Sequence, residues 1–199
     1  MERNDLAIVI LAAGKGTRMK SDKPKVLHRV AGKSMVVHVL DCARKLSQEH
    51  IHVVVGHQAG LVQEEIGQFY PVIFTQQPLL LGTGDAVKQV LPVLDSGVKK
   101  VLVLCGDVPL IQEASLRALV ATHTQAQAAL TVLGVHVANP FGYGRIVLDQ
   151  QGEMESIREE KDATQSERQI TLVNSGIYCF YERKKPSKNT APAVPDQDF

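Results

Sequence analysis

The chain has 199 residues, of which 44% are hydrophobic and 22% charged, and this composition is ordinary for one globular domain. Its net charge of +1, with Lys and Arg spread along the sequence, argues against general binding of nucleic acid. It has no bilayer-length apolar run and no signal-peptide pattern, so we expect a cytoplasmic protein without a membrane partner. The three cysteines are far apart and form no CxxC pair, which favours isolated reduced thiols.

The first half of the chain alternates short apolar runs with amphipathic segments. Strands are predicted at residues 6–10, 51–55, 72–74 and 101–104, and helices between them at 35–46, 61–66 and 85–91. Fully apolar strands fit a parallel sheet that is covered on both faces. This alternation predicts an α/β, Rossmann-like sandwich with a mostly parallel sheet and helices on both faces.

The second half is less regular. A helix is predicted at 114–122 and strands at 129–137, 142–148 and 171–180, whereas the charged stretch 153–162 is expected to line a surface or a site. The last stretch contains Lys, Pro, Ser and Asn and almost no periodic apolar residues, which predicts a disordered tail. We therefore expect one domain over residues 1–181, incomplete at its C-terminal end, and a tail over 182–199.

Three segments fall at the carboxyl ends of predicted strands: the glycine-rich loop 11–19, the loop 77–83 and Asp107. Ligands of open α/β sheets bind beyond these ends, so the three segments predict one crevice. The first loop offers backbone N–H groups to phosphate oxygens. Its region also carries cations, among them Arg18 and Lys25.

Two common phosphate-binding motifs do not fit this loop. A dinucleotide fingerprint needs a third glycine where Met19 stands, and a Walker A loop ending in 32–34 would need glycine at Leu27. The sequence also lacks G-x-S-x-G and H-E-x-x-H, so hydrolase and zinc-protease readings have no support.

A set of motifs that does fit is spread along the chain. In order they are LAAGKGTRM at 11–19, PKVLH at 24–28, LGTGDA at 81–86, GDVPL at 106–110, GYGRI at 142–146, EKDAT at 160–164 and NSGI at 174–177. Together they resemble the N-terminal domain of the bacterial bifunctional N-acetylglucosamine-1-phosphate uridyltransferases/glucosamine-1-phosphate acetyltransferases, sugar-nucleotide pyrophosphorylases with a GT-A-type fold. The resemblance covers about residues 6 to 181, and the trimer-forming acetyltransferase domain of that family is absent from the sequence.

Two related families stay open as alternatives. Glucose-1-phosphate thymidylyltransferases usually carry glycine where Ala13 stands and have a longer gap before the lysine. Methylerythritol cytidylyltransferases have a similar spacing from arginine to lysine but a different sequence around Lys25.

The resemblance implies a reaction of UTP with N-acetylglucosamine 1-phosphate, giving UDP-N-acetylglucosamine and pyrophosphate for cell-envelope precursor synthesis. The sugar phosphate is already an anionic nucleophile, so the task is to bring two anions together in line. Serine, cysteine or histidine activation is not needed for this chemistry.

The resemblance also implies the site residues. Arg18 and Lys25 would be catalytic and stabilise charge on the phosphates, and Asp107 would hold Mg²⁺. The nucleotide end would use Leu11, Ala12, Ala13, Gly14, Lys25, Gln77, Gly82, Thr83, Cys105, Gly106 and Asp107. The sugar end would use Gly144, Glu159 and Asn174, with Glu160 as a neighbouring alternative to Glu159.

The sequence departs from the family pattern at two points. Cys105 stands where related enzymes commonly carry tyrosine. The resemblance stops after Tyr181, so the later asparagine that gives the family a second protein ligand to Mg²⁺ is not matched. Two hypotheses follow: an active, stand-alone uridyltransferase, or a truncated remnant that binds nucleotide or sugar phosphate with little or no turnover.

Overall fold

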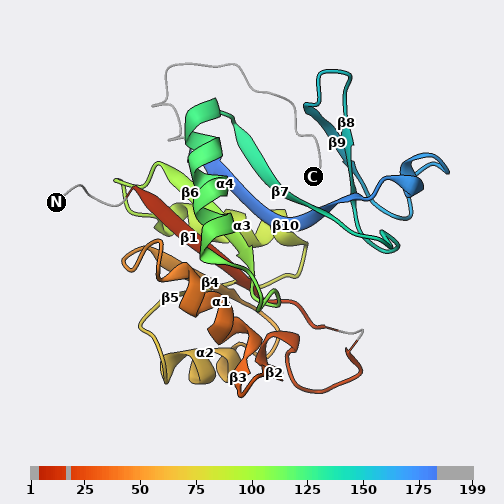
Figure 1. The fold of residues 1–199 in the computed structure, drawn as a ribbon. Coiled ribbons are helices and arrows are strands. Elements are labelled where there is room, and N and C mark those ends of the chain that lie inside the picture. Colours follow the sequence, from red (N-terminus) through yellow and green to blue (C-terminus); the bar gives the residue numbers. More distant parts are fainter. Residues whose placement is uncertain (1–4, 17–18, 183–199) are drawn as a thin grey trace.

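A computed structural model describes residues 5–16 and 19–182 of the chain (Figure 1). The larger sheet contains β1 (Leu6–Ala12), β4 (Ile51–Val55), β5 (Ile73–Gln76), β6 (Lys100–Cys105), β7 (Leu130–His136), β8 (Arg145–Leu148), β9 (Met154–Arg158) and β10 (Leu172–Tyr181). A small hairpin joins β2 (Arg29–Val30) to β3 (Lys33–Ser34). The helices are α1 (Met35–Ala43), α2 (Ala59–Gly67), α3 (Thr83–Val90) and α4 (Glu113–Ala126).

One half of the sheet is parallel, with its strands in the order β5-β4-β1-β6. The chain moves outward from β1 to β4 and β5 and then returns to place β6 on the other side of β1. The strand order therefore reverses between β1 and β6. In open α/β sheets this switch point leaves a crevice beyond the carboxyl ends of the strands.

The other half of the sheet is antiparallel and is built around β10. This strand pairs with β6 through Tyr178 and Val103, with β7 on its opposite edge, and with β8 through Val173 and Arg145. Its register shifts between Asn174 and Tyr178, where β10 bends. The hairpin of β8 and β9 stands out to one side of the parallel half (Figure 1).

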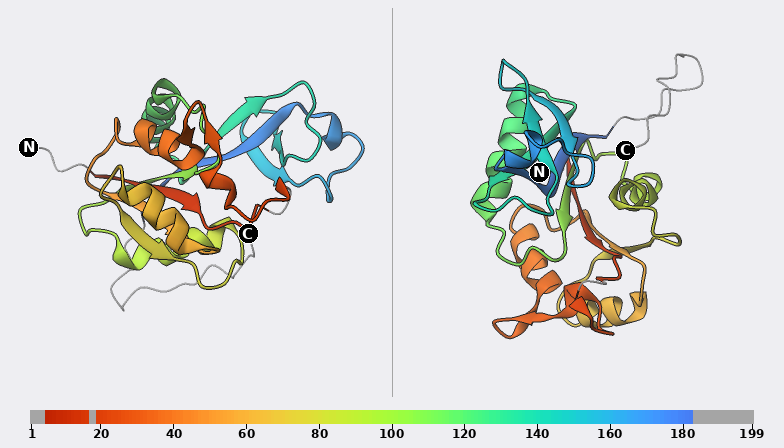
Figure 2. Two further views of the ribbon diagram at one scale, coloured as in Figure 1. Left: turned by 90° about the horizontal axis from the view of Figure 1, so that it is seen from below. Right: turned by 90° about the vertical axis from the view of Figure 1, so that its right-hand side faces the viewer.

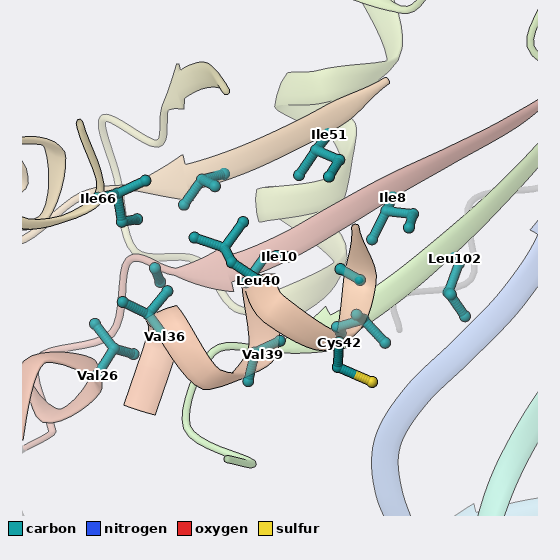
Figure 3. Packing of buried hydrophobic residues seen from close by; sticks show 14 of the residues in the cluster. Ile8, Ile10, Val26, Val36, Val39, Leu40, Cys42, Ile51, Ile66 and Leu102 are labelled. Carbon is teal, nitrogen blue, oxygen red and sulfur yellow. The ribbon is translucent and has the colours of Figure 1, made fainter. Parts of the chain in front are cut away.

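Helices cover both faces of the sheet. Successive side chains of a strand point to opposite faces, so Ile8 and Ile10 lie in a core with α1, α2 and α4, whereas Ala7 and Val9 pack against α3. Figure 3 shows the first core from close by, and the right-hand view of Figure 2 shows α3 on the side opposite α1 and α4. This double cover explains why β1 is apolar along almost its whole length.

The predicted α/β sandwich with helices on both faces is confirmed, and so are the strands and helices predicted up to residue 105. The charged stretch 153–162, expected to line a surface or a site, contains the strand β9, which was not predicted and is exposed along most of its length. The strand predicted from Gly142 begins at Arg145, since Gly142 has a φ of +83° and lies in a turn. The tail predicted for 182–199 lies outside the described residues, except for Glu182.

None of the helices in the described part of the chain is both long enough and apolar enough to cross a lipid bilayer.

Candidate active site

A cleft of about 730 Å³ opens beyond the carboxyl ends of β1, β5 and β6. Ten of the residues predicted for the site line it: Leu11, Ala12, Ala13, Gly14, Lys25, Gln77, Gly82, Thr83, Cys105 and Asp107. These residues come from segments far apart in the sequence, and the switch point between β1 and β6 brings them together.

Three glycines in or beside the cleft differ in what a side chain at their position would meet. Gly106 donates its N–H to the Leu11 carbonyl over 3.0 Å, and a Cβ there would lie 2.9 Å from the same oxygen. Gly16 has a φ of +59°, and a Cβ there would lie 2.7 Å from Cβ of Lys25. Gly14 lines the cleft, and a Cβ there would meet nothing within 4 Å. Protein packing therefore explains Gly106 and Gly16, whereas Gly14 faces the open cleft.

Lys25 and Asp107 meet in the cleft as an ion pair, with Nζ 2.6 Å from Oδ2. Pro24 precedes the short 3₁₀ turn that begins at Lys25, and Asp107 follows the end of β6. Their side chains are 38% and 30% exposed, so a ligand in the cleft can reach both charges. Arg18, the other predicted catalytic cation, lies outside the described residues.

Among the described residues, Asp107 belongs to no cluster of metal-ligating side chains. In the described ranges, no group of three or more His, Cys, Asp or Glu residues is placed to hold a metal ion. A single reachable carboxylate does suit Mg²⁺, which is commonly held by one or two carboxylates together with water and substrate phosphates.

Cys105 lines the cleft and contacts β10. Its Sγ donates to the Gly176 carbonyl over 3.3 Å. Burial, reinforced by the nearby Asp107 carboxylate, raises the pKa of this thiol to about 11. The thiol is therefore protonated at neutral pH and is not a nucleophile there.

Gln77 lies at the wall of the cleft and is only 4% exposed. Its Nε2 donates to the Gly82 carbonyl over 3.0 Å and to Oδ2 of Asp85 over 2.7 Å. Gly82 precedes α3 with a φ of +107°, a conformation that favours glycine. The loop 77–82 is thus tied to the first turn of α3.

The three residues predicted for the sugar end do not line the cleft but lie together beside it. The N–H of Asn174 donates to the Gly144 carbonyl over 2.8 Å, and a Cβ on Gly144 would lie 3.0 Å from Oε1 of Glu159. Oδ1 of Asn174 accepts from the Gly176 N–H over 2.9 Å. Since Gly176 also accepts from Cys105, the bend of β10 connects this group to the cleft.

Glu160 has structural partners that Glu159 lacks. Its Oε2 lies 2.6 Å from Nη1 of the buried Arg145 and accepts the Gly142 N–H over 3.0 Å. The Gly142 N–H and the Arg145 guanidinium hold the pKa of Glu160 below its usual value. Of the two neighbouring carboxylates, Glu159 is therefore the one beside Gly144. Glu160 instead stabilises the antiparallel lobe, by which we mean β8, β9 and β10 with their connecting loops.

Two residues beside the site were not predicted from the sequence. Asp85 holds the side chain of Gln77, and Tyr178 accepts a hydrogen bond from Nδ2 of Asn174 over 2.6 Å. No motif or periodicity links either pair in the sequence. Residues that also line the cleft without having been predicted as site residues are Lys15, Gly16, Met19, Val26, Leu80 and Ala86.

A parallel α/β half with a glycine-rich cleft at its switch point, joined to an antiparallel half, is the architecture of an α/β ligand-binding domain. The family described as MobA-like NTP transferase domain matches residues 8–170, and the chain belongs to this family.

Curated relatives at about 50% identity are bifunctional GlmU proteins. The chain is 51% identical over 179 residues to the bifunctional protein GlmU of Syntrophomonas wolfei, covering 90% of this chain and 39% of the relative. It is 54% identical over 172 residues to the bifunctional protein GlmU of Pseudomonas paraeruginosa, covering 86% of this chain and 37% of the relative. The chain thus spans less than two fifths of the length of these relatives.

Solved structures agree on the fold. A Bacillus anthracis protein described as a glucose-1-phosphate thymidylyltransferase superposes with a TM-score of 0.71 at 18% identity, over 89% of this chain and 72% of the other. HddC of Yersinia pseudotuberculosis superposes with a TM-score of 0.69 at 23% identity, over 88% of this chain and 76% of the other.

Proposed function

We propose that this domain transfers a uridylyl group from UTP to N-acetylglucosamine 1-phosphate. A phosphate oxygen of the sugar phosphate attacks the α-phosphorus of UTP, the bond to the β-phosphate breaks, and pyrophosphate leaves. The products are UDP-N-acetylglucosamine and pyrophosphate. Because both substrates are intracellular metabolites, we also infer a cytoplasmic location.

The convergence of the glycine-rich loop, Lys25, Gln77 and Asp107 in one cleft is the observation that carries this proposal. The loop after β1 can approach phosphates through its backbone because Gly14 has no side chain and faces open space. Gln77 and the loop before α3 form the wall where the base would lie. The similarity to the GlmU proteins at about 50% identity supports the choice of nucleotide and sugar.

Lys25 would stabilise the charge that develops on the transferring and leaving phosphates. Its ammonium group is held in the cleft by Asp107 rather than buried, so it is available to phosphate oxygens. Arg18, by resemblance, would act beside it. Asp107 would hold Mg²⁺ together with phosphate oxygens, and the bound ion would neutralise part of the negative charge of the triphosphate.

The sugar would lie between the cleft and the lobe of β8, β9 and β10. Glu159 offers a carboxylate to a sugar hydroxyl, and Asn174 offers an amide that the bend of β10 has already oriented. Gly144 lies against Glu159, because a Cβ there would come within 3.0 Å of its Oε1.

Pyrophosphate release from UTP, N-acetylglucosamine 1-phosphate and Mg²⁺ tests the proposal. We expect turnover by the unaltered chain and a loss of about 10²–10³-fold in Lys25→Ala, the scale of one lost group that stabilises transition-state charge. Lys23→Ala is the matched control, because Lys23 is exposed, lies two residues away and does not line the cleft.

Release that does not exceed the Lys25→Ala level would contradict the proposed turnover. Binding of UTP without turnover would then support the alternative of a nucleotide-binding remnant. Glucose 1-phosphate with dTTP and methylerythritol phosphate with CTP test the two related activities, and faster turnover with either pair would replace the proposed substrates.

A further inference from the structure

The amide of Gln77 has both of its hydrogens occupied by the protein. Nε2 donates to the Gly82 carbonyl over 3.0 Å and to Oδ2 of Asp85 over 2.7 Å. A primary amide has two N–H donors, so none is left for a ligand. The group that remains is the amide oxygen Oε1, for which the described residues supply no hydrogen-bond donor.

Chemistry fixes the orientation of this amide. Both partners of Nε2, a carbonyl oxygen and a carboxylate oxygen, are acceptors only. A flipped amide would place Oε1 against these two oxygens and lose both hydrogen bonds. Gln77 is 4% exposed and lines the cleft. Its Oε1 has no partner among the described residues and is not fully buried, so it is the group of this side chain that is open to a ligand.

Asp85 is itself held in place. It belongs to the first turn of α3, where a carboxylate is favoured by the helix dipole. Nε2 of Gln89, one turn further along α3, donates to its Oδ1 over 3.3 Å. Asp85 does not line the cleft, so its effect on a ligand passes through Gln77.

We propose that Asp85 is a positioning residue that makes the base pocket selective for a base with a ring N–H. Oriented by Asp85, Gln77 presents only an acceptor, which accepts from the N3–H of uracil but opposes the N3 lone pair of cytosine. This inference rests on the proposed function, because it assumes that a nucleoside triphosphate occupies the cleft.

Equilibrium binding of UTP and CTP to the full chain and its variants tests the proposal. In the unaltered chain we expect UTP to bind at least about tenfold more tightly than CTP, as one hydrogen bond replaced by an unpaired acceptor implies. In Asp85→Leu, which removes one of the two acceptors at similar volume, only the Gly82 carbonyl still orients the amide, so a flip costs less and the UTP to CTP ratio falls by about fivefold or more.

Two control variants separate orientation from other effects. Asp85→Asn keeps an oxygen that accepts from Gln77 and retains the ratio of the unaltered chain. Gln89→Ala removes the other hydrogen bond to Asp85 and also retains the ratio, because Gln77 keeps its partner. Binding of inorganic tripolyphosphate stays unchanged in all three variants, since it depends on the glycine-rich loop and not on the base.

A ligand variant tests the same orientation without any substitution in the protein. UTP methylated at N3 has lost its donor, so the unaltered chain should bind it about tenfold more weakly than UTP. This comparison keeps the proposal testable if Asp85→Leu does not fold.

The outcomes distinguish this proposal from the proposed function. UTP selectivity that survives in folded Asp85→Leu overturns the role of Asp85 alone. An equal loss in Asp85→Asn and Asp85→Leu also overturns it, because charge and not orientation would then matter. Equal binding of UTP and its N3-methyl form overturns the acceptor role of Gln77. A chain that binds no nucleoside triphosphate overturns both proposals.

Discussion

Gly14, which lines the cleft, and Gly106, which does not, differ in what a side chain there would meet. Gly106 is required because a Cβ would collide with the Leu11 carbonyl oxygen, which is part of the backbone and cannot move aside. Gly14 has open space in front of it, so only a ligand would meet a side chain there. One position therefore serves the fold, and the other serves the proposed nucleotide.

Gly106→Ala should destabilise the protein by about 1–3 kcal/mol, the usual cost of forcing extra atoms into a well-packed region. Gly14→Ala should leave the unfolding free energy unchanged and weaken UTP binding. Urea unfolding and nucleotide titration of the two variants check this pair. Equal stability of both variants would contradict the assignment of Gly106 to packing.

The ion pair between Lys25 and Asp107 contributes little to the stability of the fold. Both side chains are about one third exposed, and pairs this exposed contribute at most about 1 kcal/mol to stability. Lys25→Ala should therefore act on turnover and leave the fold nearly intact, so the loss expected in the pyrophosphate assay can be attributed to the missing charge.

At the scale of elements, the antiparallel lobe depends on a buried cation. Arg145 is 1% exposed at the start of β8, and its guanidinium bonds the Tyr143 and Arg168 carbonyls and the Glu160 carboxylate. Removing the carboxylate would leave a buried charge with fewer partners, which is the costly way to break such a pair. The lobe that carries Gly144, Glu159 and Asn174 therefore depends on Glu160.

Glu160→Gln should lower the melting temperature at pH 7 and remove part of the acid sensitivity of the protein. The pKa of Glu160 is lowered in the folded state, so its contribution is present above its unfolded pKa, about 4.5, and is lost as pH falls through the folded value. Melting curves between pH 3 and pH 7 check this. Glu155→Gln on the exposed side of β9 is the control and should behave like the unaltered chain.

At the scale of the whole molecule, two histidines are buried in or beside the cores. His52 lies in β4 and His123 in α4, and each has one buried ring nitrogen with no hydrogen-bond partner among the described residues. Burial lowers the pKa of both rings, with a further contribution from His50 at His52 and from Lys100 at His123. The folded protein therefore keeps these rings neutral where the unfolded chain would protonate them.

Stability should fall as pH decreases from about 7 towards 5, because the unfolded chain then binds more protons than the folded one. His52→Leu removes one titrating group and should flatten this part of the stability curve. The measurement is the free energy of unfolding in urea at intervals of pH. A slope that is unchanged in His52→Leu would contradict the neutral buried ring.

How much the sequence predicts depends on how each element is buried. The strands β1, β4 and β6 are covered on both faces, so they appear as continuous apolar runs and were predicted within two residues. β9 is largely exposed and carries charges, so its sequence lacks the apolar run from which a strand is predicted. Gln77 and Asp107 were predicted to share a crevice because both follow parallel strands, whose carboxyl ends lie at one edge.

The sequence by itself determined the α/β class, the glycine-rich loop and the residues that follow the strands, because burial and backbone conformation restrict residue types locally. Only the tertiary structure decided which side chains hold others in place. These contacts are the hydrogen bonds of Gln77 with Asp85 and of Asn174 with Tyr178, and the ion pair of Arg145 with Glu160. Their geometry depends on how α3, the bend of β10 and the start of β8 are placed, and no local pattern of residues encodes that placement.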